Sequence, residues 1–249
     1  MKPDVVADVG NSRIKWGYCQ GDKVAGFASL EPENPEVWQR QFSSWNLSGR
    51  TKWVVGGVQP QRLDSLVSWL RERNAEVVIV DSWQQLPLAI AVPHKERVGI
   101  DRLFNAVAAK SRLRHDTDTL MIGAGTAVTV DWMDTTGAFR GGAIFPGLRL
   151  MAQALHDYTA RLPVVEPPHS EVAFPGTTTV TAIQSGIFWA IAGGIQAFIR
   201  QIASRASAHP EVFLTGGDAP LFAPALDSGV HMWREMTLEG IRLTAETLP

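Results

Sequence analysis

The chain has 249 residues, of which 45% are hydrophobic and 19% are charged, and its formal net charge is -2. This apolar fraction is ample for a sizeable core and excludes a disordered tail protein. The balance of charges removes the electrostatic basis for a nucleic-acid-binding surface. The single cysteine, Cys19, can form neither an intramolecular disulfide nor a thiolate zinc cage, so a reduced cytoplasm is the expected compartment.

No membrane or signal segment is expected. The first residues carry Lys2, Asp4 and Asp8 instead of a continuous apolar stretch. The most apolar stretch lies between Gln184 and Gln196 and is shorter than the ~20 residues that a membrane helix needs. We therefore expect a soluble, globular protein.

The first half of the chain alternates predicted strands and helices. Residues 5–10 and 14–18 are typical of two strands joined by a Gly-Asn-Ser turn, which predicts a hairpin. A helix is expected to begin at Asn34-Pro35, since proline is favoured at the first helical position. A strand over 51–58, a helix over about 63–74, a strand over 77–80 and a helix over 100–108 follow.

The second half begins the same plan again after a polar stretch over 112–119. Residues 120–131 predict another strand, glycine turn and strand, and residues 212–217 resemble residues 53–57. Alternating strands and helices make each half α/β. We predict two similar halves, 1–114 and 115–249, with one large mixed domain as the alternative.

The segment from Asp8 to Lys15 is the first candidate site. Glycine lets the backbone approach a ligand, Asn and Ser groups and free amides can cradle phosphate oxygens, and Lys15 adds a positive charge. Asp8, at the end of a buried strand, could hold Mg²⁺ through oxygen. The alternative is an ordinary hairpin whose Gly-Asn-Ser only turns the chain.

A second glycine turn, residues 123–129, occupies the equivalent place in the second half. Two such loops could grip a triphosphate, although each could also be a plain hairpin turn. The spacing fits neither a P-loop nor the Gly-x-Gly-x-x-Gly entry of a dinucleotide fold. The histidines lack zinc-ligand spacing, and no nucleophile elbow is present.

A third candidate lies at the start of the predicted helix over 100–108. A carboxylate beside an arginine, as in Asp101-Arg102, stays ionised and can accept a proton from a substrate hydroxyl. The alternative is that Asp101 is only a favourable charge at a helix N-terminus and Arg102 is solvated.

In this order and spacing, the motifs resemble those of type III pantothenate kinases, within the acetate and sugar kinase/actin-like superfamily. The resemblance runs over nearly the whole chain. It includes Asp8-Val9-Gly10-Asn11-Ser12 with Lys15, Gly99-Ile100-Asp101-Arg102, Gly125-Thr126-Ala127-Val128-Thr129, Gly141-Gly142-Ala143-Ile144-Phe145-Pro146-Gly147, Thr159-Ala160-Arg161-Leu162-Pro163, Thr179-Val180-Thr181-Ala182-Ile183-Gln184-Ser185-Gly186, Leu214-Thr215-Gly216-Gly217-Asp218 and Leu238-Glu239-Gly240-Ile241.

The resemblance implies two duplicated RNase H-like halves, a homodimer, and ATP and pantothenate bound in the cleft between the halves. It implies transfer of the ATP γ-phosphoryl group to pantothenate, giving 4′-phosphopantothenate, the first committed step to coenzyme A. Asp101 would accept the proton and Asp8 would lie near Mg²⁺. The implied ATP-binding residues are Asp8, Val9, Gly10, Asn11, Ser12, Arg13, Ile14, Lys15 and Thr126; those for pantothenate are Gly99, Ile100, Asp101, Arg102 and, from the partner subunit, Thr179.

Two departures from the family pattern leave alternatives open. Gly123 stands where the family places the aspartate that holds an activating monovalent cation, K⁺ or NH₄⁺, so this cation site is expected to be weakened or lost. Val92, His94 and Lys95 stand where the family tends to place a Tyr and an Asn-Pro that help wall the pantothenate site. The alternatives are a non-catalytic, nucleotide-binding regulatory relative and a kinase that acts on a different small hydroxyl compound.

Overall fold

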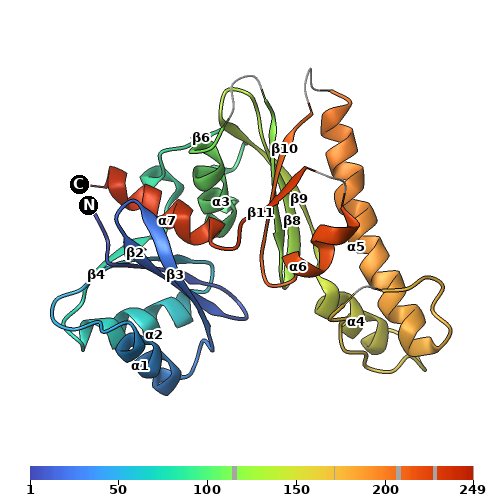
Figure 1. Ribbon diagram of the computed structural model, residues 1–249, viewed down its shortest axis with the longest axis horizontal. Helices are drawn as coiled ribbons and strands as arrows, with labels where there is room; N and C mark the ends of the chain where they lie inside the picture. Colours follow the sequence, from blue (N-terminus) through green and yellow to red (C-terminus); the bar gives the residue numbers. More distant parts are fainter. Residues whose placement is uncertain (114–116, 171, 206–208, 227–228, 249) are drawn as a thin grey trace. The chain divides into compact units, whose positions relative to one another are not determined.

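The computed structural model describes residues 1–113, 117–170, 172–205, 209–226 and 229–248 (Figure 1). The predicted boundary between residues 114 and 115 lies outside the described residues. By its internal contacts the chain divides into two compact units. Unit 1 comprises Met1–Arg112, Gly137–Phe139 and Glu235–Pro249, and unit 2 comprises Leu113–Thr136 and Arg140–Arg234. The C-terminal segment thus packs with unit 1.

Unit 1 is built on a five-stranded mixed sheet in the order β3-β2-β1-β4-β5. Its strands are β1 (Val5–Val9), β2 (Ile14–Gln20), β3 (Lys23–Leu30), β4 (Lys52–Gly57) and β5 (Glu76–Val80). The first three form an antiparallel meander, and β4 and β5 run parallel to β1. The predicted hairpin is confirmed, since Val9 pairs with Ile14 across the first turn.

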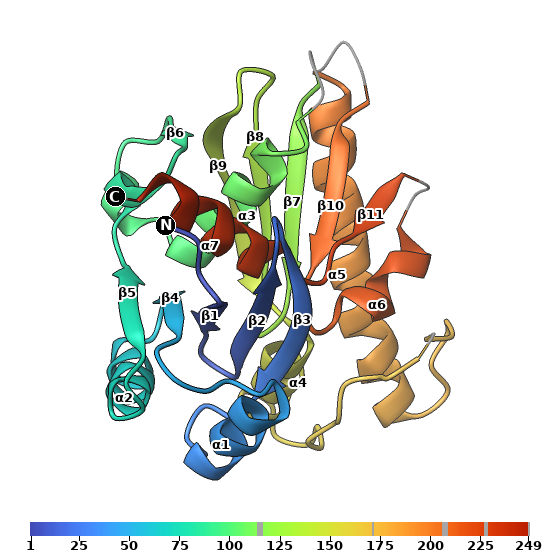
Figure 2. The ribbon, with the colours of Figure 1, turned by 60° about the vertical axis from the view of Figure 1, so that its left-hand side comes forward.

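Helices pack on the sheet of unit 1 in two pairs: α1 (Pro35–Ser44) with α2 (Pro60–Arg71), and α3 (Ile100–Lys110) with α7 (Met236–Thr247) (Figure 2). α1 begins at Pro35 as predicted, and α2 begins at Pro60, earlier than the predicted residue 63. Asn34 and Gln59 accept hydrogen bonds from backbone N–H groups of the first turns. The core under this first pair is rich in aromatic side chains, which include Trp16, Trp38, Phe42, Trp53 and Trp69.

The other face of the same sheet lets its helices approach closely because it carries glycines. A Cβ at Gly56 of β4 would lie 2.6 Å from the ring of Phe104 in α3. A Cβ at Gly240 of α7 would lie 1.9 Å from the carbonyl oxygen of Phe104. Three short elements, η1 (Trp83–Gln85), β6 (Ala89–Ile90) and η2 (Lys95–Arg97), connect β5 to α3.

Unit 2 repeats the topology of the first sheet. Its strands β7 (Thr119–Ala124), β8 (Ala127–Met133), β9 (Ala138–Pro146), β10 (Glu211–Thr215) and β11 (Val230–Met232) follow the order β11-β10-β7-β8-β9. β7 and β8 are antiparallel, and β10 and β11 run parallel to β7. The first residues of β9, Ala138 and Phe139, belong to unit 1 and pair there with β6. The predicted α/β class is confirmed, and the structure shows that both sheets are mixed.

The sheet of unit 2 packs against α5 (Thr179–Ala203), with α4 (Leu148–Asp157), α6 (Ala219–Phe222) and η3 (Ala223–Ala225) beside it. The apolar stretch between Gln184 and Gln196 is part of a longer helix, α5, of 25 residues. Judged only by its length and composition, α5 is long and apolar enough to cross a membrane. One such helix is weak evidence for a membrane protein, and its inward side chains, such as Ile191 and Ile195, are fully buried in the core.

Candidate active site

The turn between β1 and β2 places a buried carboxylate opposite a lysine. Asp8 is the fourth residue of β1 and pairs in register with Lys15 of β2. The Gly10 N–H donates to the Arg13 carbonyl at 3.1 Å and closes the turn. A Cβ at Gly10 would lie 3.1 Å from that same carbonyl oxygen, so the tight turn favours glycine. The Lys15 Nζ lies 3.5 Å from the Asp8 Oδ2, and the lysine keeps partial access to solvent.

The environment of Asp8 opposes its ionisation. Burial is the main cause of a raised pKa for this carboxyl; the charge of Asp101 raises the pKa further, and Lys15 lowers it. The Asp8 Oδ1 is buried and has no hydrogen-bond partner among the described residues. A buried carboxylate oxygen without a donor is stabilised by a cation or by the water of a hydrated cation.

The N-terminus of α3 brings a second carboxylate into unit 1. Gly99 is the N-cap of α3, and the Asp101 Oδ1 accepts a hydrogen bond of 2.9 Å from the Arg102 N–H. The Arg102 guanidinium lies 5.8 Å from the centre of the Phe139 ring. Asp8 and Asp101 are near enough for the charge of one to affect the pKa of the other. The structure thus brings together two of the predicted motifs, residues 8–15 and 99–102.

Three backbone turns meet in unit 2 around the second predicted glycine loop. The Gly125 N–H donates to the Ala127 carbonyl at 3.2 Å, and the Gly147 N–H donates to the Thr126 carbonyl at 3.0 Å. The Asp218 N–H donates to the Ala124 carbonyl at 3.1 Å. Thr126 is exposed at this junction. The predicted turn over residues 123–129 therefore joins β7 and β8 as a hairpin. Hydrogen bonds from Gly147 and Asp218 connect it to two other loops.

The loop of residues 216–218 belongs to this junction, although no role was predicted for it. Gly216 has a φ of +108°, and a Cβ there would lie 2.0 Å from the Ala124 carbonyl oxygen, so glycine is required twice over. Burial raises the pKa of the Asp218 carboxyl and the charge of Arg149 partly offsets this. The similarity of residues 212–217 to residues 53–57 was the signal that could have placed this loop at a site.

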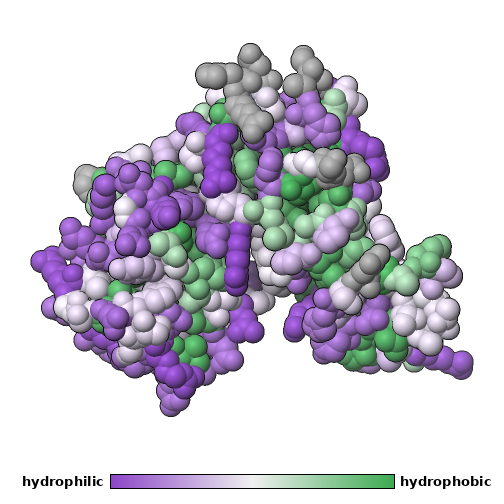
Figure 3. Space-filling model, viewed as in Figure 1, coloured by the Kyte–Doolittle hydropathy of each residue, from purple (hydrophilic) through white to green (hydrophobic). Residues whose placement is uncertain are grey.

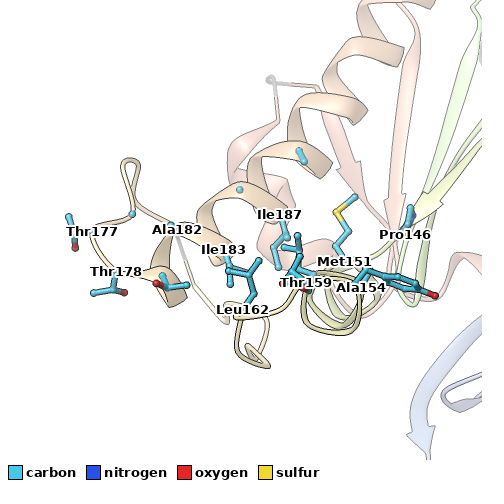
Figure 4. A pocket seen from close by; sticks show the side chains of 16 residues that line it. Pro146, Met151, Ala154, Thr159, Leu162, Thr177, Thr178, Ala182, Ile183 and Ile187 are labelled. Carbon is cyan, nitrogen blue, oxygen red and sulfur yellow. Dashed lines mark hydrogen bonds between the residues drawn. The ribbon is translucent and has the colours of Figure 1, made fainter.

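Thr179 is the first residue of α5 in unit 2, where it is exposed. It lines a groove of about 1090 Å³ that lies wholly within unit 2, between α4 and α5. Figure 4 shows Met151 and Ala154 of α4 beside Ile183 and Ile187 of α5 in this groove. The groove is therefore mainly apolar, with threonines at one end.

Comparisons with known proteins identify the family. A family model described as type III pantothenate kinase matches residues 5–201. The type III pantothenate kinase of Paramagnetospirillum magneticum is 34% identical over 245 residues, which cover 94% of this chain and 93% of the relative. The chain belongs to the type III pantothenate kinase family. The resemblance stated from the motifs is thereby confirmed.

The other comparisons agree with this family and with its fold. The type III pantothenate kinase of Gluconobacter oxydans is 28% identical over 253 residues, covering 97% of this chain and 92% of the relative. A solved structure from Campylobacter jejuni, assigned to the Baf family of transcriptional activators, aligns with a TM-score of 0.61 over 97% of both chains at 19% identity. At that identity the likeness shows the fold alone. A solved structure from Sinorhizobium meliloti, described as a 2-dehydro-3-deoxygalactonokinase, aligns with a TM-score of 0.58 over 97% of this chain and 98% of that chain, at 12% identity. The expected sugar-kinase-like fold is thereby confirmed.

Gly123, the position at which the resemblance implies a cation-binding aspartate, has no side chain that could bind a cation. Gly123 lies in β7 and is paired on both sides, with Thr129 of β8 and Thr215 of β10. It has no side chain, and its backbone lies inside the sheet. Among the residues that the structure describes, no group of three His, Cys, Asp or Glu side chains could hold a metal ion. The residues at this position do not fit a monovalent cation.

The second departure from the family lies in the segment that leads into Gly99. Lys95 in η2 lies with its Nζ 5.1 Å from the centre of the Trp83 ring, a cation–π contact. The His94 Nδ1 lies 3.4 Å from the Glu96 carboxylate, and both side chains are mostly exposed. Val92 is half-buried. The segment of residues 92–97 thus carries basic side chains, and the contact between Lys95 and Trp83 helps to hold it.

Proposed function

We propose that this chain transfers the γ-phosphoryl group of ATP to pantothenate, giving ADP and 4′-phosphopantothenate. Membership of the type III pantothenate kinase family supports this activity. The observation that carries it is the pair of carboxylates in unit 1, one buried with an unpartnered oxygen and the other at the start of α3. Nothing in the comparisons supports a non-catalytic relative.

We assign the proton transfer to Asp101. The acceptor hydroxyl oxygen attacks the γ-phosphorus, the bond to the ADP oxygen breaks, and the hydroxyl proton passes to the Asp101 carboxylate. The hydrogen bond from the Arg102 N–H holds one carboxylate oxygen in place, which leaves the other available to the substrate. Gly99, Ile100 and Arg102 are proposed to bind pantothenate around it.

We assign the ATP phosphates to the segment from Asp8 to Lys15, together with Thr126 of unit 2. Lys15 supplies a positive charge that remains accessible to solvent. Backbone N–H groups of the turn are proposed to bind phosphate oxygens as well. Asp8 fits Mg²⁺ because its Oδ1 is buried without a donor. When bound, Mg²⁺ would neutralise charge on the phosphate oxygens. No step is assigned to a monovalent cation, since Gly123 offers no ligand for it.

We propose a homodimer that uses the apolar face of α4, α5 and their connecting loop. Several large hydrophobic side chains are exposed on this part of the chain. Figure 3 shows hydrophobic patches there, interspersed with hydrophilic residues. Tyr158, Phe174 and Trp189 are 88%, 81% and 44% exposed, an unusual exposure for such large side chains. Thr179 at the rim of the same face would then contact pantothenate bound to the partner subunit.

Two further assignments complete the proposal. We place the enzyme in the cytoplasm, consistent with its one free cysteine, Cys19. We also propose that the two repeated sheets derive from two duplicated RNase H-like halves that meet near residues 114 and 115. The repeated strand order, meander followed by two parallel strands, supports this duplication.

The decisive experiment is a coupled ADP-release assay with and without pantothenate, in sodium, potassium and ammonium salts. We expect pantothenate-dependent release that Asp101→Ala lowers by at least about 100-fold. Asp64→Ala, which removes an exposed aspartate on α2, serves as the matched control. Full activity of Asp101→Ala would refute the assigned base. Activity with other small alcohols but not with pantothenate would refute the assigned acceptor.

A further inference from the structure

An arginine from the neighbouring helix contacts the backbone of the turn between β1 and β2. Arg62 lies in the first turn of α2, and its Nη1 donates a hydrogen bond to the carbonyl oxygen of Asn11. Its Nε and Nη2 each lie 3.0 Å from the same carboxylate oxygen of Glu33, just before α1. All three residues belong to unit 1. Arg62 therefore joins three separate segments of one unit.

The backbone of Arg62 is itself fixed, so its side chain starts from a defined position. The Arg62 N–H donates to the side chain of Gln59, the N-cap of α2, at 3.2 Å. The guanidinium is mostly buried, with 22% of the side chain exposed, whereas Glu33 is 75% exposed. A planar guanidinium held on one edge by a carboxylate has few orientations left for its remaining N–H groups.

The contact with Asn11 controls the direction of a peptide plane in the turn. In a trans peptide the C=O and the following N–H point in opposite directions. Holding the Asn11 carbonyl toward Arg62 therefore turns the Ser12 N–H the other way. A rotation of this peptide would exchange the two groups and present a carbonyl oxygen, which repels phosphate, where an N–H would attract it.

We propose that Arg62 is a positioning residue for nucleotide binding: by holding the Asn11 carbonyl, it keeps the Asn11–Ser12 peptide oriented so that the turn presents N–H groups to phosphate. This inference rests on the proposed role of residues 8–15 as the phosphate-binding segment. Glu33 aligns the guanidinium. Arg62 acts on ATP through the backbone of the turn, so its loss affects nucleotide binding more than acceptor binding.

The test compares Arg62→Ala, Arg62→Lys and Glu33→Gln with Arg73→Ala in the full-length enzyme. Arg73 is a matched control: it also lies at the surface of unit 1, is 31% exposed, and bonds to Gln39 and the Trp69 carbonyl, but it does not contact the turn. Thermal melts of all four variants report folding. Calorimetry with ADP and steady-state kinetics report nucleotide and acceptor binding separately.

We expect Arg62→Ala to raise the KM for ATP and the Kd for ADP about tenfold, the size of one hydrogen bond to a charged group, with the KM for pantothenate changed less than about twofold. Arg62→Lys keeps the positive charge but lacks the planar guanidinium, so its KM for ATP should lie between those of the wild type and Arg62→Ala. Glu33→Gln should show a smaller increase, of about threefold, because the contact with Asn11 remains. Arg73→Ala should leave both constants unchanged.

A fifth variant separates this inference from the proposal on which it rests. Lys15→Ala should also raise the KM for ATP if residues 8–15 bind phosphate. A raised KM for ATP in Lys15→Ala but not in Arg62→Ala would overturn the role of Arg62 alone. Unchanged values in both would overturn the phosphate-binding role of the segment. Equal losses for ATP and pantothenate in Arg62→Ala would indicate a merely structural residue and would also overturn the inference.

Discussion

Gly56→Ala tests whether the close approach of α3 to the sheet positions the carboxylate pair. Gly56 pairs in register with Asp8, and a Cβ there would lie 2.6 Å from two ring atoms of Phe104, three residues after Asp101. Carbon atoms in contact prefer about 3.5–4.0 Å, so the ring must retreat by roughly 1 Å. Phe104 is fully buried, so we expect α3 to move together with its ring.

Overpacking of this kind costs about 1–3 kcal/mol, and for a chain of this size each kcal/mol lowers Tm by about 2–4 °C. We therefore expect Gly56→Ala to lower Tm by about 2–12 °C. Because a misplacement of about 1 Å can reduce a rate about 100-fold, we also expect kcat to fall by about 10- to 100-fold.

Thermal melts followed by circular dichroism and the ADP-release assay measure the two effects separately. Gly193→Ala in α5 is the matched control, since a Cβ there meets nothing within 4 Å and alanine favours a helix. It should keep its activity and melt at the same temperature or slightly higher. An unchanged Tm and kcat in Gly56→Ala would refute the packing argument. A lowered Tm with a normal kcat would support the packing argument but refute the idea that this packing positions Asp101.

Four further predictions follow from other residues. Because burial raises the Asp8 pKa, folding favours the protonated carboxyl. The stability that the protonated carboxyl contributes is full below its ordinary pKa and is lost as pH rises through the raised pKa. Asp8→Asn should therefore raise Tm at pH 7 while lowering kcat at least about 100-fold, and an unchanged Tm would contradict the direction of the pKa shift. Burial raises the pKa of the Cys19 thiol to about 12, so thiol reagents at pH 8 should label the native enzyme far more slowly than the unfolded one. Trp189→Glu should give monomers by light scattering, and a stable dimer would contradict the proposed interface. Gly123→Asp should increase stimulation by potassium, and an unchanged salt profile would count against the role of this position.

The local structure was largely predictable because strong short-range signals determined it. The glycine turn after Asp8, the proline helix start at Pro35 and the second turn at Gly125 all lie where the pattern predicts them. These features depend on residues next to one another in the chain. The motif order also identified the family, which the comparisons confirm.

Contacts between distant segments could not be predicted in this way. α7 packs on the first sheet although nearly the whole chain separates them. Residues 216–218 join the β7–β8 turn through the backbone hydrogen bond from Asp218 to Ala124. The contact from Arg62 to the Asn11 carbonyl has no sequence signature, because any backbone carbonyl can accept from an arginine. Such contacts depend on the fold being in place.

The two faces of the first sheet explain how one small unit serves both stability and chemistry. On one face, bulky aromatic residues such as Trp16 and Trp53 fill the space under α1 and α2 and contribute large buried apolar side chains to the core. On the other face, Gly56 lets α3 approach the strand next to Asp8, and Gly240 of α7 lets α7 approach α3. A larger core on the second face would raise stability but hold Asp101 farther from Asp8, so the unequal packing is the condition for the carboxylate pair.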